Sequence, residues 1–213
     1  MIPSMSEFTP SLMSLLDITS IISKVQLAYN VAKIPIGFKD KFFACNEMAK
    51  QYGKLLANCL ILQFPFVNQS VSLFGFVLGA QVLYSCLEEL YSKKADNIVH
   101  NVYFIRGAVD SSDHNKWAKV LSVVRGTVYN YYSHGNKSLY AYKTVTQNSP
   151  IGMKALLTIK NEKNNMKEKE RIDRLKDGLR IVNVDTTRNN IDGANYKDDL
   201  ERNWPQIFEN MKI

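Results

Sequence analysis

The stretch Val71-Ser72-Leu73-Phe74-Gly75-Phe76-Val77-Leu78-Gly79 decides the fold of this 213-residue chain. It begins with a short apolar run that ends in glycine, a pattern typical of a buried strand. The next residues, Ala80 to Tyr91, carry apolar side chains at helical spacing. The sequence therefore predicts a strand that turns directly into a helix, which is the first half of a βαβ unit.

The rest of the chain continues this alternation. Further strands are expected at residues 99–105, 127–133 and 180–185, and helices at residues 11–32, 39–63, 112–124 and 196–211. Short strands separated by helical or mixed crossovers indicate parallel pairing with right-handed connections. We therefore expect an α/β fold with a short, mostly parallel sheet of about four strands flanked by helices.

Gly75, Val77 and Gly79 have the spacing of the G-x-S-x-G nucleophile elbow, in which a tight turn presents the central side chain at the top of a sheet. Valine has no nucleophilic atom, and its β-branching makes a positive φ costly. The turn is therefore either relaxed or held under strain. A packing site for small residues between strand and helix would explain the two glycines nearly as well.

From about Leu15 to Phe208 the chain resembles the α/β-hydrolase-like family named for transmembrane and coiled-coil domains. Members of that family carry a G-F-S-L-G-A elbow followed by a similar helix. Further matches occur in the same order at Gly107-Ala108-Val109, Trp117-Ala118-Lys119, Arg125 to Ser133 and Val182-Asn183-Val184-Asp185. The resemblance implies a partial α/β-hydrolase-like fold.

The resemblance also implies where a catalytic triad would lie. The nucleophile position falls on Val77, the acid on Asn136 or close to it, and the histidine on Gly193, with Tyr196 matching a nearby tyrosine. Serine hydrolysis needs a nucleophile, a general base and an acid that orients the base. A chain lacking all three is expected to be a pseudoenzyme without catalytic residues, and we expect it to hold no cofactor and no metal.

Two segments are expected along the chain. Residues 1–66 form an N-terminal helical segment, and residues 67–213 form a truncated hydrolase-like domain with a charged insertion at about 160–178. That insertion is either a solvated helix or loop, or a contact arm for a partner. Because only two helices precede Val71, the sheet would have an uncovered edge. We therefore expect other protein subunits of a large complex to cover it.

The remaining candidates for chemistry are few. His114 follows Asp113 at a helix start and is expected to be a surface residue beside a cap. Ser133-His134 lies at the C-terminal end of a parallel strand, where ligands bind in such sheets, so a residual esterase or lipid-binding module stays open as an alternative. However, adjacent residues on a strand point apart, and no carboxylate is expected to orient His134. The three cysteines are expected to be buried free thiols.

Charge and hydropathy narrow the class of partner. The net charge of +7 and the pI near 9.2 suit an anionic partner or a membrane surface, but the scattered lysines and arginines do not favour nucleic acid. A peripheral membrane protein that uses N-terminal amphipathic helices is a further alternative. No segment has the length and hydropathy of a bilayer span. The sequence favours an accessory subunit in a reducing intracellular compartment, and a mitochondrial membrane complex is the location we expect.

Overall fold

The computed structural model of the chain describes residues 38–65, 67–134, 137–158 and 178–187. The helices expected at residues 11–32 and 196–211, and nearly all of the charged insertion, lie outside these ranges. The chain divides into two compact units, and the one formed by residues 46–187 contains the whole sheet. The boundary expected between residues 66 and 67 stays a prediction.

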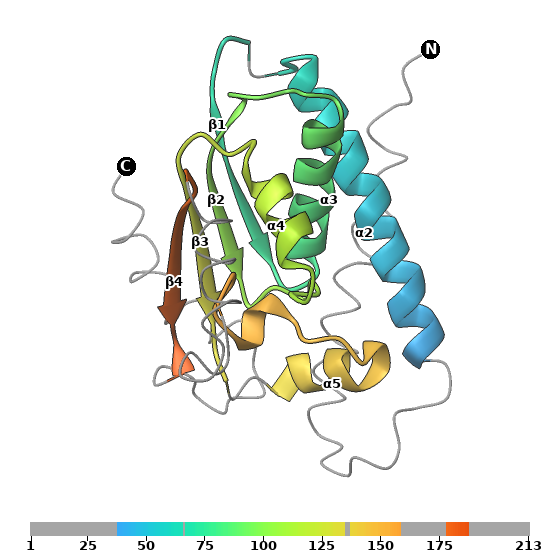
Figure 1. The fold of residues 1–213 in the computed structure, drawn as a ribbon. Coiled ribbons are helices and arrows are strands. Elements are labelled where there is room, and N and C mark those ends of the chain that lie inside the picture. The colour runs from blue at the N-terminus through green and yellow to red at the C-terminus, as the bar shows by residue number, and fades with distance from the viewer. Residues whose placement is uncertain (1–37, 66, 135–136, 159–177, 188–213) are drawn as a thin grey trace. The chain divides into compact units, whose positions relative to one another are not determined.

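The described elements alternate between helices and strands. Their order is α2 (Phe38–Ile61), β1 (Val71–Phe76), α3 (Gly79–Ser92), β2 (Val99–Ile105), α4 (His114–Leu121), β3 (Thr127–Tyr132), α5 (Lys137–Thr146), a short 3-10 helix (Ile151–Met153) and β4 (Arg180–Asp185). The strands form one sheet in the order β1-β2-β3-β4, and every neighbouring pair is parallel. The expected α/β fold with a four-stranded parallel sheet is confirmed (Figure 1).

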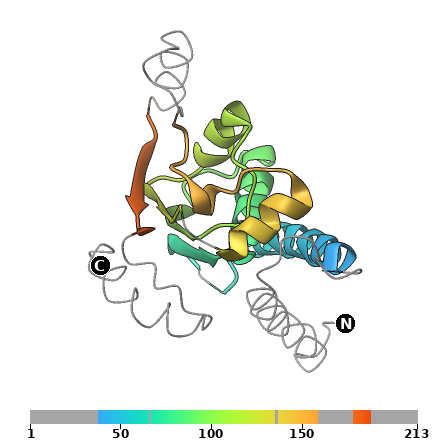
Figure 2. The same cartoon turned by 90° about the horizontal axis from the view of Figure 1, so that it is seen from below.

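The sequential strand order places the main helices on one face of the sheet. Each crossover moves to the next strand in the same direction, and right-handed connections then put α3 and α4 on the same side. Figure 2 shows these two helices together beside the sheet. Five of the described strand residues belong to the hydrophobic core between the sheet and these helices: Leu73, Val99, Val102, Phe104 and Val128. Trp117 of α4 packs edge-on against Phe104, with ring centroids 5.7 Å apart.

Helix α2 packs closely on α3 at Gly53. A Cβ at this position would lie 2.4 Å from the Val82 carbonyl oxygen and 2.6 Å from Ser85 Cβ. Both distances are far below van der Waals contact, so only glycine permits this approach of the two helices. Ala57 and Leu60 of α2 then enter the same core as α3.

The other face of the sheet carries an aromatic row. Phe74, Tyr103 and Tyr129 occupy matching register positions on β1, β2 and β3. The ring centroids of Phe74 and Tyr103 are 6.0 Å apart, and those of Tyr103 and Tyr129 are stacked at 4.8 Å. Cross-strand aromatic pairs of this kind stabilise a sheet in addition to the core on its other face.

Three elements differ from the expectation. Helix α5 (Lys137–Thr146) and the 3-10 helix (Ile151–Met153) lie in a segment for which no element was predicted. The α5 sequence KSLYAYKTVT contains threonine, valine and tyrosine, which have modest helix propensity. Helix α4 is also shorter than the 112–124 predicted, although Asp113 caps it as expected by accepting a hydrogen bond from the Lys116 backbone N–H at 2.9 Å.

Candidate functional site

The turn between β1 and α3 has the backbone of a strained elbow. Val77 adopts a φ of 46°, in the left-handed region. Its N–H donates to the Ile105 carbonyl at 3.0 Å, and its carbonyl accepts from the N–H groups of Ala80 and Ala108 at 3.2 and 2.9 Å. Of the two alternatives left open for this turn, the strained one is confirmed. A left-handed residue with a Cβ costs about 1–2 kcal/mol, which the surrounding hydrogen bonds offset.

The glycines around Val77 have different roles. A Cβ at Gly75 would come within 2.9 Å of the Leu83 side chain and the Gly79 carbonyl oxygen, so strand and helix could not approach as they do. A Cβ at Gly107, on the neighbouring loop, would meet Ala80 and Ile151 equally closely. Gly79, by contrast, faces open space. Close packing therefore explains Gly75, and it does not explain Gly79.

The Val77 side chain occupies the central elbow position and is 8% exposed. An isopropyl group there can neither attack an acyl carbon nor donate a hydrogen bond. Asn136 and Gly193, the other two predicted triad positions, lie outside the described residues. The structure therefore gives the geometry of one of the three positions, and the absence of a triad stays a prediction.

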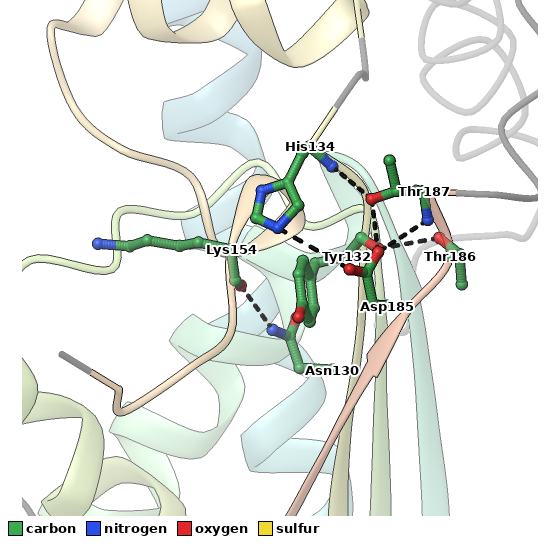
Figure 3. A network of polar contacts seen from close by, with 7 residues as sticks. All are labelled: Asn130, Tyr132, His134, Lys154, Asp185, Thr186 and Thr187. Atoms are coloured by element: carbon green, nitrogen blue, oxygen red, sulfur yellow. Dashed lines mark hydrogen bonds and ion pairs between the residues drawn. The ribbon is translucent and has the colours of Figure 1, made fainter. Parts of the chain in front are cut away.

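A second group of polar side chains lies at the C-terminal ends of β3 and β4 (Figure 3). His134 Nε2 lies 3.9 Å from Asp185 Oδ2, and the His134 backbone N–H donates to Thr187 Oγ1 at 3.0 Å. Thr187 in turn donates its backbone N–H to Asp185 Oδ1 at 2.8 Å. Asp185 is thus a carboxylate neighbour of His134 that the sequence did not indicate, but at 3.9 Å it does not hydrogen-bond to the imidazole to orient it. Tyr132 pairs with Asp185 in the sheet register, which places the end of β4 next to the residues that follow β3.

The His134–Asp185 pair is weak as a catalytic unit. At 3.9 Å the two atoms form an ion pair only when the imidazole is protonated, and the distance is too long for a hydrogen bond. Both side chains are about half exposed, and exposed pairs contribute little free energy. The imidazole therefore lacks the fixed orientation that a general base in a triad has.

Ser133 does not complete a catalytic group with His134. Its side chain is fully buried, and Oγ has no hydrogen-bond partner among the described residues. The His134 side chain is 60% exposed, so the two neighbours point apart, as expected. A buried hydroxyl that does not donate to a base is not activated as a nucleophile.

An asparagine pair supports this edge from within the core. Asn130 Nδ2 donates to the carbonyls of Ile151 and Lys154 at 3.2 and 3.0 Å and to Asn183 Oδ1 at 3.2 Å. Asn183 also exchanges two hydrogen bonds with the Leu156 backbone, at 2.7 and 3.1 Å. The pair fixes residues 151–156 against β3 and β4.

Sequence reasoning missed Arg106, which directly follows β2 beside the elbow. Arg106 is 5% exposed and has a φ of 48°. Its backbone N–H donates to the Tyr131 carbonyl at 2.9 Å, so it continues the β2–β3 hydrogen bonding past the end of the strand. The signal available in the sequence was an arginine placed immediately after the apolar residues of a predicted strand.

The cysteines fit structural thiols more closely than reactive ones. All three are free, but only Cys86 is buried; Cys45 and Cys59 are half-buried, so the expectation that they are buried was wrong. Burial raises the pKa of the Cys86 thiol to about 12 and also raises that of Cys45. A thiol with a raised pKa stays protonated and is a poor nucleophile at neutral pH. Within the described residues, no group of three His, Cys, Asp or Glu side chains could hold a metal ion.

Comparison with known proteins places the chain in a family. Residues 5–179 match the family described as "Protein of unknown function (DUF726)". Three relatives illustrate the range of names that similar proteins carry. A protein of Saccharomyces cerevisiae named probable lipase MIL1 is 35% identical over 130 residues, which are 59% of this chain and 12% of the relative. An uncharacterized membrane protein of Schizosaccharomyces pombe is 41% identical over 40% of this chain and 11% of its own.

The third relative, from Oryza sativa subsp. japonica, is named transmembrane and coiled-coil domain-containing protein STS1 and is 33% identical over 44% of this chain and 14% of its own. These names are consistent with a hydrolase-like family. The matched segments cover between 11 and 14% of the three relatives. No solved structure matched the chain. Two of the relatives are named for membranes, and none of the helices in the described residues is long and apolar enough to cross one.

Proposed function

We propose that this chain, which belongs to the DUF726 family, is a non-catalytic hydrolase-like module. In this proposal it serves as an accessory part of a larger protein assembly. The observation that carries this proposal is Val77, which keeps the strained backbone of a nucleophile elbow with a φ of 46° and has no nucleophilic atom. Strain at such a turn is useful to an enzyme because it presents a reactive side chain. Here the turn connects and packs β1 and α3.

The shape of the sheet supports the second half of the proposal. Among the described residues, β1 and β4 form the two edges of the sheet, and no described strand pairs with their outer sides. Val182 on β4 is 42% exposed. Parallel sheets are usually covered on both faces, and open edges are sites where another chain adds. We propose other protein subunits as the partners and a mitochondrial membrane complex as the location.

The claim that the chain is non-catalytic is tested by an esterase assay on the full chain with short-chain and long-chain nitrophenyl esters. We expect no turnover above buffer for the wild-type chain and none for Val77→Ser, because a serine alone lacks a base and an acid. Turnover by the wild-type chain at more than about tenfold over buffer would contradict the proposal.

The assembly half is tested by native gel electrophoresis of a gentle detergent extract, followed by mass spectrometry. Migration in a large defined complex is expected, together with co-migrating subunits that name the partners. Migration near the chain's own mass of 24.3 kDa would refute the assembly.

A second candidate function, a residual esterase or lipid-binding site, is favoured by one observation, the His134–Asp185 pair. The same assay separates it from the first. Ester turnover that is present in the wild-type chain, lost in His134→Ala and retained in Lys143→Ala would support the residual site. Lys143 is the matched control because it lies on α5 and is not part of the pair.

A further inference from the structure

Helix α2 ends in a Schellman motif that leaves its next apolar residue in solvent. The Gln63 N–H donates to the Leu60 carbonyl, and the Phe64 N–H donates to the Cys59 carbonyl, both at 3.0 Å. Gln63 has the left-handed φ of 55° that this motif requires. In such motifs an apolar residue at the Phe64 position frequently packs back on the helix. Here Phe64 is 71% exposed, so its side chain projects away from the helix end.

Three apolar side chains share this end of the molecule. Leu62 is 77% exposed, Phe64 71% and Val67 65%, and these are the three most exposed large hydrophobic residues that the structure describes. Single exposed apolar residues are normal on a protein surface. Here three occur within six positions, and backbone hydrogen bonds anchor the turn that carries Leu62 and Phe64. We call Leu62, Phe64 and Val67 the apolar tip.

Lysines lie beside the apolar tip. Lys93, the C-cap of α3, donates its ammonium to Asn58 Oδ1 at 2.6 Å, which ties it to α2 one turn before Leu62. Lys94 follows in the left-handed region with a φ of 53°, and α3 also ends in a Schellman motif. The acidic side chains on the last turn of α3 and in the loop after it are Glu89, which pairs with Lys93 at 3.2 Å, and Asp96. The chain as a whole has a net charge of +7.

The apolar tip is remote from the elbow. Figure 1 shows α2 and α3 ending where β1 begins, whereas Val77 follows the other end of β1. The tip is therefore not a part of the candidate site, and the proposed function does not explain it.

We propose that the apolar tip inserts into the interface of an anionic lipid bilayer, with Lys93 and Lys94 against the lipid headgroups. A fluid bilayer accepts separate side chains that project from a convex turn, whereas a protein partner needs a surface of matching shape. Apolar insertion together with basic neighbours is the combination that holds peripheral proteins on anionic membranes. This contact uses the end of α2 and does not depend on N-terminal amphipathic helices.

Vesicle sedimentation of the full chain tests the proposal. Vesicles of phosphatidylcholine alone are compared with vesicles containing about a third phosphatidylserine. We expect the wild-type chain to pellet with the anionic vesicles and the triple variant Leu62→Ser, Phe64→Ser, Val67→Ser to bind at least about tenfold more weakly. Tyr140→Ser is the matched control, because Tyr140 is 50% exposed and lies on α5. Its binding should equal that of the wild type.

The same experiment can overturn the proposal in two ways. A wild-type chain that pellets with neither vesicle has no such contact, and a triple variant that binds like the wild type places the contact elsewhere. Because all three substitutions are at exposed positions, the variant should keep the thermal midpoint of the wild type.

A tryptophan probe gives an independent readout. In Phe64→Trp, the emission should shift to the blue when anionic vesicles are added. A blue shift that instead grows with protein concentration in the absence of lipid would identify a second copy of the chain as the occupant and overturn the lipid proposal.

Discussion

At Val77 the backbone and the side chain have different requirements. The φ of 46° suits glycine, whereas the buried position, with 8% of the residue exposed, suits an apolar side chain. The observed valine satisfies burial and accepts the strain. The position is therefore one at which substitutions should not follow the usual order of stability.

The strain at Val77 predicts that the glycine variant is more stable than the alanine variant, which reverses the usual order of stability. Alanine keeps the Cβ that makes a left-handed φ costly, and glycine removes it. We expect Val77→Gly to be more stable than Val77→Ala by roughly 0.5–1 kcal/mol in urea unfolding. At Val128, which is 2% exposed and lies in a regular strand, the order should be the ordinary one, with alanine the more stable. An ordinary order at both positions would show that Val77 is not strained.

At the scale of elements, the two helices that flank the apolar tip end in the same way without glycine. Gln63 and Lys94 take the left-handed position of their Schellman motifs, where glycine is the usual residue. Lysine at a helix C-terminus has a compensating interaction with the helix dipole, and glutamine does not. Gln63 is therefore the position at which a substitution can stabilise the end of α2.

Replacing Gln63 by glycine should raise the free energy of unfolding by roughly 0.5–1 kcal/mol, because the left-handed φ no longer costs a Cβ clash. Chemical denaturation of the two proteins measures the difference. Lys54→Gly, at an exposed interior position of α2, is the control and should lower the stability by about 1 kcal/mol. A stability unchanged or lowered in Gln63→Gly would mean that the helix end is not held in this conformation.

At the scale of the whole molecule, buried ionisable groups set the response to alkaline pH. Burial raises the pKa of Tyr84, Tyr131 and Tyr142 to about 12 from an ordinary 10.0, and that of Cys86 to about 12 from 9.0. These groups lose their protons in the unfolded chain first. Their contribution to stability is therefore complete below about pH 9 and is lost as the pH rises toward 12.

Urea unfolding at pH 8, 10 and 11 should show a falling midpoint. Tyr131→Phe should reduce this fall and leave the stability at pH 8 nearly unchanged, because the Tyr131 hydroxyl has no hydrogen-bond partner among the described residues. A midpoint that stays constant between pH 8 and 11 would mean that water reaches these side chains in the folded protein.

The sheet could be predicted from the sequence because each strand is indicated by a short local pattern of apolar residues. The runs from Val71, Val99, Thr127 and Arg180 each alternate or cluster apolar residues over a strand length, and their intervening segments dictate parallel pairing. The elbow was also predictable, because the Gly75–Gly79 spacing lies within five residues. The strain at Val77 remained one of two alternatives until its φ was known.

The features that sequence reasoning missed depend on register. Asp185 lies beside His134 only because Tyr132 of β3 pairs with Asp185 of β4, and no pattern along the chain specifies that alignment. Helix α5 was missed because its residues have weak propensity and its position depends on tertiary packing. The buried Arg106 was missed because a charged residue after a strand ordinarily indicates an exposed loop.

The sequential order of the sheet has a consequence for synthesis on the ribosome. Since the strands pair in sequence order, β2 and β3 each find the preceding strand already synthesised when they leave the exit tunnel. The sheet can then grow in one direction without rearrangement. Its last strand, β4, begins at Arg180, well after β3 ends at Tyr132. The outer side of β3 in the nascent three-stranded sheet therefore waits longer for its partner strand than β1 waits for β2 or β2 for β3. During that interval a chaperone would have the largest unpaired strand edge to cover.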